Sequence, residues 1–283
     1  MFRSTQPSLF EQAFSPESMN QAWLRFRNEK AHWQPKVDMD LLKAHFPLHL
    51  ITLIRQVESD AYRPDRVKQF SLTKGDGSER IIQAQSVRDK YVQRCVLNAI
   101  EPVGEALFYN DSFGYRPNRG VEDAVSRTRD RLRQGLEWVV DADIRHFFDS
   151  IAHKPLMQQV RRHIKDKKIL RLIERWLAEG PHHKSLFGSR RGLAQGSVIS
   201  PFLTNLYLHQ LDDALHKENI PFVRFADDFV LLTQTKEQAH LARHFVSKTL
   251  SRLDLALHPD KTKIVHHPNQ GLHFLGRYIK PIK

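Results

Sequence analysis

The hydrophobic pattern divides the chain into helical stretches, with three- to four-residue spacing, and strand-like stretches. Helical spacing covers residues 8–62 and 89–107, and recurs in VEDAVSRTRDRLRQGL, a helix that we expect to end at Gly135. It returns over 154–179, in the C-terminal half of 193–215, and over 236–254. Strand-like runs cover 66–83, where two short strands meet at a turn over 74–77, and then 138–151, 221–232, 262–267 and 272–279.

Helices and strands are mixed without regular strand–helix–strand alternation. That order predicts an α+β fold built on an antiparallel sheet. The chain shows no internal repeat and no low-complexity linker.

Composition narrows the class of protein. Of the 283 residues, 40% are hydrophobic, which is enough for a sizeable core, and 44 Lys and Arg against 32 Asp and Glu give a net charge of +12. A basic chain of this kind indicates a polyanionic partner, with nucleic acid as the leading candidate. The one cysteine, Cys95, excludes internal disulfides and cysteine-based zinc sites. Without an apolar leader or a run of roughly 20 apolar residues, we expect a cytoplasmic protein with no membrane partner.

Two adjacent carboxylates, Asp227 and Asp228, interrupt the apolar run PFVRFADDFVLL. Burying such a pair is costly, so it needs a cation, a solvent-exposed turn, or both. Asp143 is similarly embedded in VVDADIRHFF, and it would converge with Asp227 if the two strands were neighbours in one sheet. Three carboxylates would suit hard divalent cations such as Mg²⁺, and two such ions can drive an in-line phosphoryl transfer. A merely polar hairpin turn is the open alternative.

Six segments in chain order carry a more specific signal. They are SFGYRPNRGVEDAV, DADIRHFFDSI, GLAQGSVISP, RFADDFVLL, LHPDKTKIV and FLGRYI. This series resembles the successive blocks of reverse transcriptases, especially the bacterial lineage related to group II introns, over residues 66–279. The resemblance implies a right-hand polymerase with fingers and palm, an RNA template, deoxynucleoside triphosphates, a 3′-hydroxyl or other priming group, and two Mg²⁺ ions, for which Mn²⁺ can substitute.

The same resemblance implies a domain layout. Residues 1–65 would be an N-terminal helical extension, 66–135 the first part of the fingers, 136–153 the first part of the palm, 154–192 a helical insertion, and 193–283 the palm with a primer-supporting hairpin. Only seven residues follow Gly276 in this sequence, and we therefore expect no helical thumb. We therefore expect a dedicated structured RNA, a second subunit or the N-terminal helices to supply the missing grip on the duplex.

The family's catalytic roles carry over onto a short set of positions. Asp143 and Asp227 would be the principal ligands of both metal ions, Asp228 a weaker third carboxylate, and Ile144 part of the same metal site. Lys261, in PDKTK, matches the lysine that would protonate the pyrophosphate leaving group.

Nucleotide selection would depend on the palm and the fingers. Phe148 matches the aromatic steric gate that clashes with a 2′-hydroxyl, although core packing is the alternative, with Phe147 on the opposite face of a strand. Lys74 and Arg80 resemble the pair that grips the triphosphate, against the alternative of plain surface charge.

The remaining positions concern the template and the primer. Gln195 and Gly196 would hold the nucleotide and the template base, and Ser200 and Pro201 complete that block, where a Ser-Pro helix start is the alternative. Nucleic-acid contacts would also come from Arg116, as template contact or fingers structure, and from Leu275 and Gly276 in the primer hairpin.

The function predicted in this way is RNA-directed DNA synthesis. Compact standalone enzymes of the lineage resemble retron and defence-associated reverse transcriptases. We therefore expect the protein to copy a cognate noncoding RNA and to act in defence against bacteriophage. The partners would be that RNA, nascent DNA and deoxynucleotides, with an oligomer or accessory subunit possible. Two alternatives stay open: an RNA-templated RNA polymerase, and a scaffold that binds RNA without catalysis.

Substituting Phe148→Ala tests the steric gate. Removal of the ring should admit a 2′-hydroxyl and raise ribonucleotide use relative to deoxynucleotide use by about tenfold or more, equivalent to ~1.4 kcal/mol of discrimination. Primer extension with competing ribo- and deoxynucleotides measures the ratio. An unchanged ratio would favour the core-packing alternative.

Overall fold

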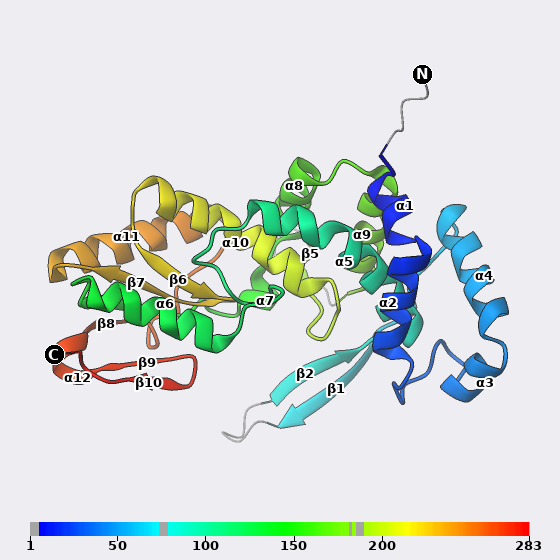
Figure 1. Ribbon diagram of the computed structural model, residues 1–283, viewed down its shortest axis with the longest axis horizontal. Coiled ribbons are helices and arrows are strands. Elements are labelled where there is room, and N and C mark those ends of the chain that lie inside the picture. Colours follow the sequence, from blue (N-terminus) through cyan, green and yellow to red (C-terminus); the bar gives the residue numbers. More distant parts are fainter. Residues whose placement is uncertain (1–5, 74–78, 181–182, 185–189, 283) are drawn as a thin grey trace. The chain divides into compact units, whose positions relative to one another are not determined.

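The computed structural model describes residues 6–73, 79–180, 183–184 and 190–282, except the side chains of 68–70, 79–83 and 183–184. The chain forms two compact units. The first comprises Met1–Ala106 and Met157–Phe202, and the second comprises Leu107–Leu156 and Leu203–Lys283. Figure 1 labels most elements of both.

The first unit begins with the helices that the spacing over 8–62 predicts. They are α1 (Leu9–Ala13), α2 (Pro16–Phe26), α3 (Met39–Ala44) and α4 (Phe46–Glu58). Local chemistry sets their starts, because the side chain of Ser8 accepts the Glu11 N–H while Glu11 accepts the Ser8 N–H, and Asp38 caps α3.

The rest of the first unit follows the prediction, except that one predicted helical stretch forms two helices. β1 (Lys68–Thr73) pairs antiparallel with β2 (Glu79–Ala84), and α5 (Val87–Leu107) follows. The basic stretch over 154–179 forms two helices, α8 (His153–His163) and α9 (Lys167–Glu179), because the Asp166 carboxylate accepts the N–H groups of Lys168 and Ile169 and starts a new helix. The short strands β4 (His183–Lys184) and β5 (Arg190–Arg191) complete the unit.

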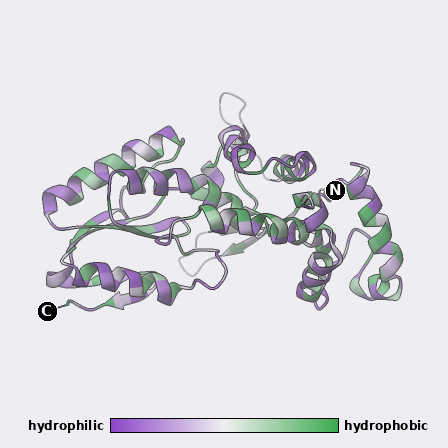
Figure 2. Ribbon diagram, turned by 45° about the horizontal axis from the view of Figure 1, so that its top comes forward, coloured by the Kyte–Doolittle hydropathy of each residue, from purple (hydrophilic) through white to green (hydrophobic). Residues whose placement is uncertain are grey.

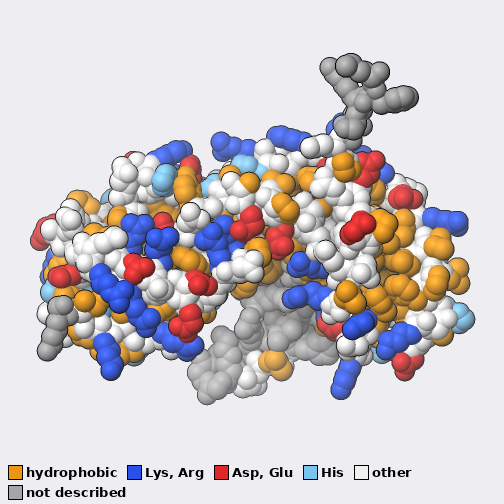
Figure 3. All heavy atoms as spheres, in the orientation of Figure 1, with side chains coloured by type: hydrophobic (Ala, Val, Ile, Leu, Met, Phe, Trp, Pro, Cys, Tyr) orange, Lys and Arg blue, Asp and Glu red, His pale blue; other side chains and the backbone are white. Residues whose placement is uncertain are grey.

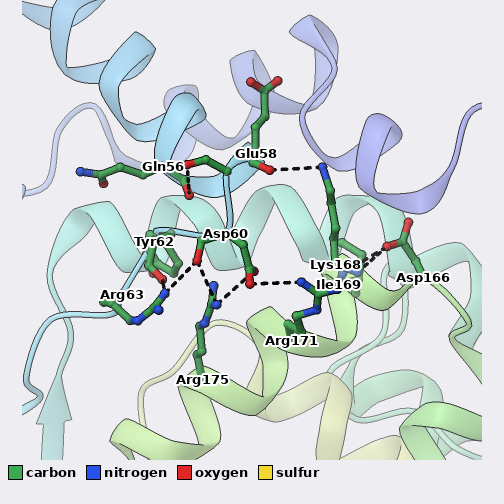
Figure 4. A network of polar contacts seen from close by, with 11 residues as sticks. Gln56, Glu58, Asp60, Tyr62, Arg63, Asp166, Lys168, Ile169, Arg171 and Arg175 are labelled. Carbon is green, nitrogen blue, oxygen red and sulfur yellow. Dashed lines mark hydrogen bonds and ion pairs between the residues drawn. The ribbon is translucent and has the colours of Figure 1, made fainter.

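Ion pairs attach the segment after α4 to α9 within the first unit (Figure 4). The Asp60 carboxylate lies 3.1 Å from Arg171 and 3.0 Å from Arg175, and the Lys168 amine donates to the Glu58 carbonyl at 3.4 Å. Asp166 adds a link by accepting the Phe10 N–H of α1 at 2.9 Å. The N-terminal helices are therefore bound to the basic helix α9 by polar contacts.

The second unit is built on an antiparallel sheet with the strand order β6-β7-β3-β8. These strands are β6 (Phe222–Phe225), β7 (Asp228–Thr233), β3 (Trp138–Ala142) and β8 (Lys263–His266). The predicted α+β class with an antiparallel sheet is therefore confirmed. Figure 2 shows that the helices beside the strands alternate between hydrophobic and hydrophilic residues.

Helices and a hairpin enclose the sheet. The helix α11 (Lys236–Arg252) contacts β7, β3 and β8. The helix α6 (Val121–Arg133) and the hairpin of β9 (Leu272–Phe274) and β10 (Arg277–Ile279) share a buried core with the sheet that includes Val125, Val139 and Phe274. The long helix α10 (Ser200–Lys217) precedes β6 in the chain, and the short helix α12 (His267–Gln270) precedes β9.

One strand prediction was too long. β3 ends at Ala142, after which the Arg145 N–H donates to the Ala256 carbonyl and the His258 N–H donates to the Asp143 carbonyl. His146 then adopts a left-handed conformation (φ 46°), and Phe147–Ser150 forms the short helix α7. The argument that strand alternation separates Phe147 from Phe148 was therefore wrong, although Phe147 is buried and Phe148 only half-buried.

No helix among the described residues is long and apolar enough to cross a membrane.

Removing the Asp166 carboxylate should loosen the N-terminal helices. Asp166→Ala deletes a helix cap and the bond to Phe10, and should lower the free energy of unfolding by about 2–4 kcal/mol. The matched control is Asp38→Ala, which removes only the cap of α3 and should cost about 1 kcal/mol. Denaturant unfolding measures both, and equal losses would contradict the contribution of the Phe10 contact.

Candidate active site

The sheet brings the sequence-predicted carboxylates together at one end. β3 runs antiparallel to β7 with Ala142 opposite Phe229, so the end of β3 meets the start of β7. Asp143 follows β3 directly, while Asp227 lies in the turn between β6 and β7, and Asp228 is the first residue of β7. The two strands are neighbours in one sheet, which was the condition for Asp143 and Asp227 to converge.

The turn that carries Asp227 is a tight two-residue connection. Phe225 pairs with Asp228, which leaves Ala226 and Asp227 as the turn residues, and Ala226 adopts a left-handed conformation (φ 58°). Two-residue hairpins require such positive φ angles. The conformation is unfavourable for alanine, so other contacts must hold the turn in place.

An open cleft of about 490 Å³ lies over this end of the sheet. Four carboxylates line it, those of Asp141, Asp143, Asp227 and Asp228. The amine of Lys261 lies beside them. Its remaining walls come from Ala142 and from His273, Phe274, Leu275 and Gly276 of the β9–β10 hairpin. Four acidic groups around one amine make the cleft a strong attractor for cations.

Lys261 is the counter-charge of Asp143. Its Nζ atom lies 2.8 Å from Asp143 Oδ2, and the hydrogen bond to Asp143 raises the pKa of Lys261. The Asp143 side chain is only 18% exposed, whereas that of Lys261 is 65% exposed. The lysine can therefore leave the carboxylate without disturbing the core.

Burial and mutual repulsion raise the pKa values of the other carboxyl groups. Burial is the largest cause for Asp227, whose pKa is raised, and it raises the pKa of Asp141 to about 6. Asp228 is exposed as a residue, yet partial burial of its carboxyl group, followed by the charges of Asp227 and Asp143, raises its pKa to about 6. The site therefore favours arrangements that bring positive charge to these oxygens.

The donor set fits Mg²⁺. Among the described residues, no three Asp, Glu, His or Cys side chains already stand as a complete metal-ligand cluster. Mg²⁺ is usually held by one or two carboxylates together with substrate phosphates and water, so a preformed cage of three ligands is not required. Asp143 and Asp227 supply hard oxygen donors of this kind.

Asp141 was missed by the sequence analysis. It lies on β3 two residues before Asp143, and side chains two apart on a strand project from the same face. The DAD spacing could have identified it.

Other predicted palm residues lie in the second unit. Leu275 and Gly276, with φ angles of 53° and 73°, form the turn of the β9–β10 hairpin and line the cleft. Phe148 lies in α7 with its ring 5.6 Å from that of Phe147. The Ile144 side chain is buried and has no donor atom, so only its backbone carbonyl could bind a metal.

Arg116 takes a structural position. It is buried, and its Nη1 donates to the carbonyls of Tyr109 and Ser112 at 2.6 and 2.7 Å. This geometry favours the structural alternative over a direct template contact.

The predicted nucleotide-binding residues of the first unit are described only in part. Lys74 lies outside the described residues, and Arg80 lies in β2 without a described side chain. Gly196 has a φ of 101°, which explains the need for glycine, and Ser200 and Pro201 begin α10. Gln195 precedes this turn.

A buried glutamine that sequence reasoning overlooked organises this turn. The Oε1 atom of Gln93 accepts hydrogen bonds from Ser197 Oγ and from the N–H groups of Val198 and Ile199. It thereby satisfies the backbone just before α10. A glutamine within an amphipathic helix gives no sequence signal for this role.

Comparison with known proteins defines the class. Telomerase structures share the fold: that of apo telomerase from Candida tropicalis gives a TM-score of 0.56 at 13% identity, covering 76% of this chain and 53% of that one. The telomerase of Candida albicans gives 0.54 at 16% identity, covering 77% of this chain and 44% of that one. At these identities the matches show that the chain shares the fold of the two telomerase structures.

Sequence relatives define the family. The model of the reverse transcriptase (RNA-dependent DNA polymerase) family matches residues 72–279. Protein YkfC of Escherichia coli is 31% identical over 98% of this chain and 85% of its own length. The group II intron-encoded protein LtrA of Lactococcus lactis is 29% identical over 71% of this chain, which spans only 34% of LtrA. The chain belongs to the reverse transcriptase family, and its enzymatic class is RNA-directed DNA polymerase.

Gly114 provides a test of how tightly the Asp227 turn is held. A Cβ atom at this position would lie 2.3 Å from the Ala226 nitrogen, a backbone atom that cannot yield cheaply. Gly114→Ala should therefore displace the turn, destabilise the protein by about 1–3 kcal/mol and reduce nucleotide incorporation.

Gly120→Ala is the matched control in the same unit, because its added Cβ would meet only Asp123 Oδ2 at an ordinary 3.6 Å. Thermal unfolding and primer extension on both variants make the comparison. Wild-type behaviour of Gly114→Ala would show that the turn tolerates displacement.

Proposed function

We propose that the acidic cleft is the polymerase active site and that it joins deoxynucleotides to a primer 3′-hydroxyl by two-metal phosphoryl transfer. The observation that carries the proposal is the meeting of Asp143 with the Asp227–Asp228 turn in one cleft. In the reaction a bond forms between the 3′-oxygen and the α-phosphorus, and the bond from that phosphorus to pyrophosphate breaks.

Asp143 and Asp227 are the proposed metal ligands, with Asp228 and the Ile144 carbonyl in support. When bound, Mg²⁺ (or Mn²⁺ in its place) activates the attacking oxygen and neutralises charge on the leaving oxygen. Lys261, released from Asp143, is positioned to give a proton to the departing pyrophosphate. While the amine is paired with Asp143, the hydrogen bond to that carboxylate raises the pKa of Lys261 and keeps it protonated.

The other proposed roles surround this centre. Phe148 would exclude the 2′-hydroxyl, and Leu275 and Gly276 would support the primer beside the cleft that they line. In the fingers we assign the triphosphate to Lys74 and Arg80. Gln195 and Gly196 would hold the nucleotide and template base, with Ser200 and Pro201 completing that block.

The template is proposed to be a cognate structured noncoding RNA, and the biological role defence against bacteriophage. A net charge of +12 supports a polyanionic partner, and Figure 3 shows Lys and Arg side chains over α6 on the face in view. Several relatives are described as intron-encoded or intron proteins. The defence role rests on the resemblance of the motif series to compact retron-like enzymes.

Sequencing the nucleic acids that co-purify with the protein tests the template. One enriched RNA, with complementary DNA that is absent from an Asp143→Asn preparation, is the expected result. An assortment of cellular RNA without matching DNA would refute a cognate template.

Neutralising the metal ligands tests the active site. Asp143→Asn and Asp227→Asn should each reduce primer extension at least ~10³-fold, because metal-ion stabilisation contributes several kcal/mol and each 1.36 kcal/mol is tenfold. Asp228→Asn should cost less. The surface control Asp130→Asn, on the exposed side of α6, should extend normally. Full biological activity of an Asp227→Asn, Asp228→Asn double variant would favour the scaffold alternative.

A further inference from the structure

A completely buried arginine lies three residues before Asp227. Arg224 is on β6, and both it and its partner Asp212 on α10 are 0% exposed. Taking a guanidinium and a carboxylate out of water is costly, and a buried ion pair often stabilises a protein no better than apolar residues of the same size would. The pair therefore calls for an explanation other than stability.

All five N–H donors of the Arg224 side chain have an acceptor. Nε and Nη2 bind the two oxygens of Asp212 at 2.8 and 2.5 Å. Nη2 also donates to Ser112 Oγ at 2.7 Å, and Nη1 donates to Asn205 Oδ1 at 2.9 Å. The second N–H group of Nη1 donates to the carbonyl of Ala226 at 3.0 Å. Only the planar fork of arginine can serve this set.

The Ala226 carbonyl is the contact that concerns the active site. Its peptide group leads directly into Asp227, and Ala226 holds the unfavourable left-handed φ of 58°. The Arg224 side chain thus ties the strained turn to α10, through Asp212 and Asn205.

A second set of contacts closes around the same turn. The Asn205 amide donates to the Gly114 carbonyl at 2.7 Å, and Gly114 packs against the Ala226 nitrogen so closely that no side chain fits. The backbone of Arg224 exchanges bonds of 2.8 Å with Asp111 and Phe113. The loop before α6, the helix α10 and the hairpin turn are therefore joined through one guanidinium.

We propose that Arg224, held by Asp212, is a positioning residue that fixes the Asp227 carboxylate at the location required for metal binding. This inference rests on the proposed role of Asp227 as a metal ligand. Arg224 is not among the residues that line the cleft, so it acts through the Ala226–Asp227 peptide rather than on substrate. Outer partners of this kind orient metal ligands, and losing them commonly costs 10- to 100-fold in metal affinity or activity.

The decisive variant is the double substitution Arg224→Met, Asp212→Leu. It removes both buried charges together, so the fold should persist. The turn loses its anchor, and we expect a metal requirement raised about tenfold and primer extension reduced about 100-fold. Binding of a labelled template–primer should stay near wild type. Arg224→Lys keeps the charge but not the planar fork. It should likewise raise the metal requirement and reduce primer extension.

Asp213→Asn is the matched control. Asp213 neighbours Asp212 on α10 but pairs with Lys217 and accepts from Tyr109 away from the turn. It should keep wild-type extension and metal dependence. The readouts are extension rates over a Mn²⁺ titration, Mn²⁺ binding to the nucleic-acid-free protein by electron paramagnetic resonance, and thermal unfolding.

Two outcomes would overturn the inference. One is wild-type metal dependence and extension in a folded double variant. If that variant does not fold, Asn205→Ala and Ser112→Ala each remove one neutral acceptor, and wild-type metal dependence in both overturns the inference instead. Asp227→Asn separates the two proposals: if it extends normally, the proposed active site is wrong, and if it is inactive while the Arg224 variants are normal, only the positioning role is wrong.

Discussion

The ion pair between Arg224 and Asp212 is the interaction on which the arrangement of the second unit most depends. It lies where the β6–β7 hairpin, the helix α10 and the loop before α6 meet, and it contacts the backbone at the Asp227 turn. Apolar contacts are non-directional and tolerate small shifts, whereas a guanidinium with five satisfied donors permits one geometry. Hydrophobic packing thus supplies the bulk of the core, and this polar centre determines where the turn lies.

A conflict between rigidity and repulsion shapes the acidic cleft. Carboxylates held close together repel one another and are costly to desolvate, as the raised pKa values of Asp141 and Asp228 show. The sheet supports this concentration of charge because the strands beneath it are apolar and fully buried, as at Val140 and Leu231. The unfavourable cluster of carboxylates is therefore held by the rigid antiparallel sheet.

Much of the fold and of the acidic cleft could be predicted from the sequence. The carboxylates of Asp143, Asp227 and Asp228 stand out because charge within an apolar run is rare, and the order of the motifs indicates the family. The hydrophobic pattern also predicted where the strands of the sheet lie, but not which of them are neighbours. The extent of β3 could not be predicted, because its end is set by hydrogen bonds to residues 256–258, more than 100 positions away in the chain.

The residues that support the site were harder to predict. Arg224 within a strand is indistinguishable in sequence from a solvent-facing arginine, and its five acceptor atoms come from three separate segments of the chain. Gln93 likewise acts on backbone groups about a hundred residues away. Such partners are defined only by the tertiary structure. Asp141, by contrast, required only local alternation.

The contact between Lys261 and Asp143 affects the order in which the protein folds and binds its metal ions. Many small metalloproteins cannot fold until their ion arrives, because their ligands have no other partner. Here the exposed amine of Lys261 already balances the largely buried carboxylate of Asp143. Folding and metal loading can therefore be separate events, and a newly made chain can complete its palm before it meets an ion, a nucleotide or an RNA.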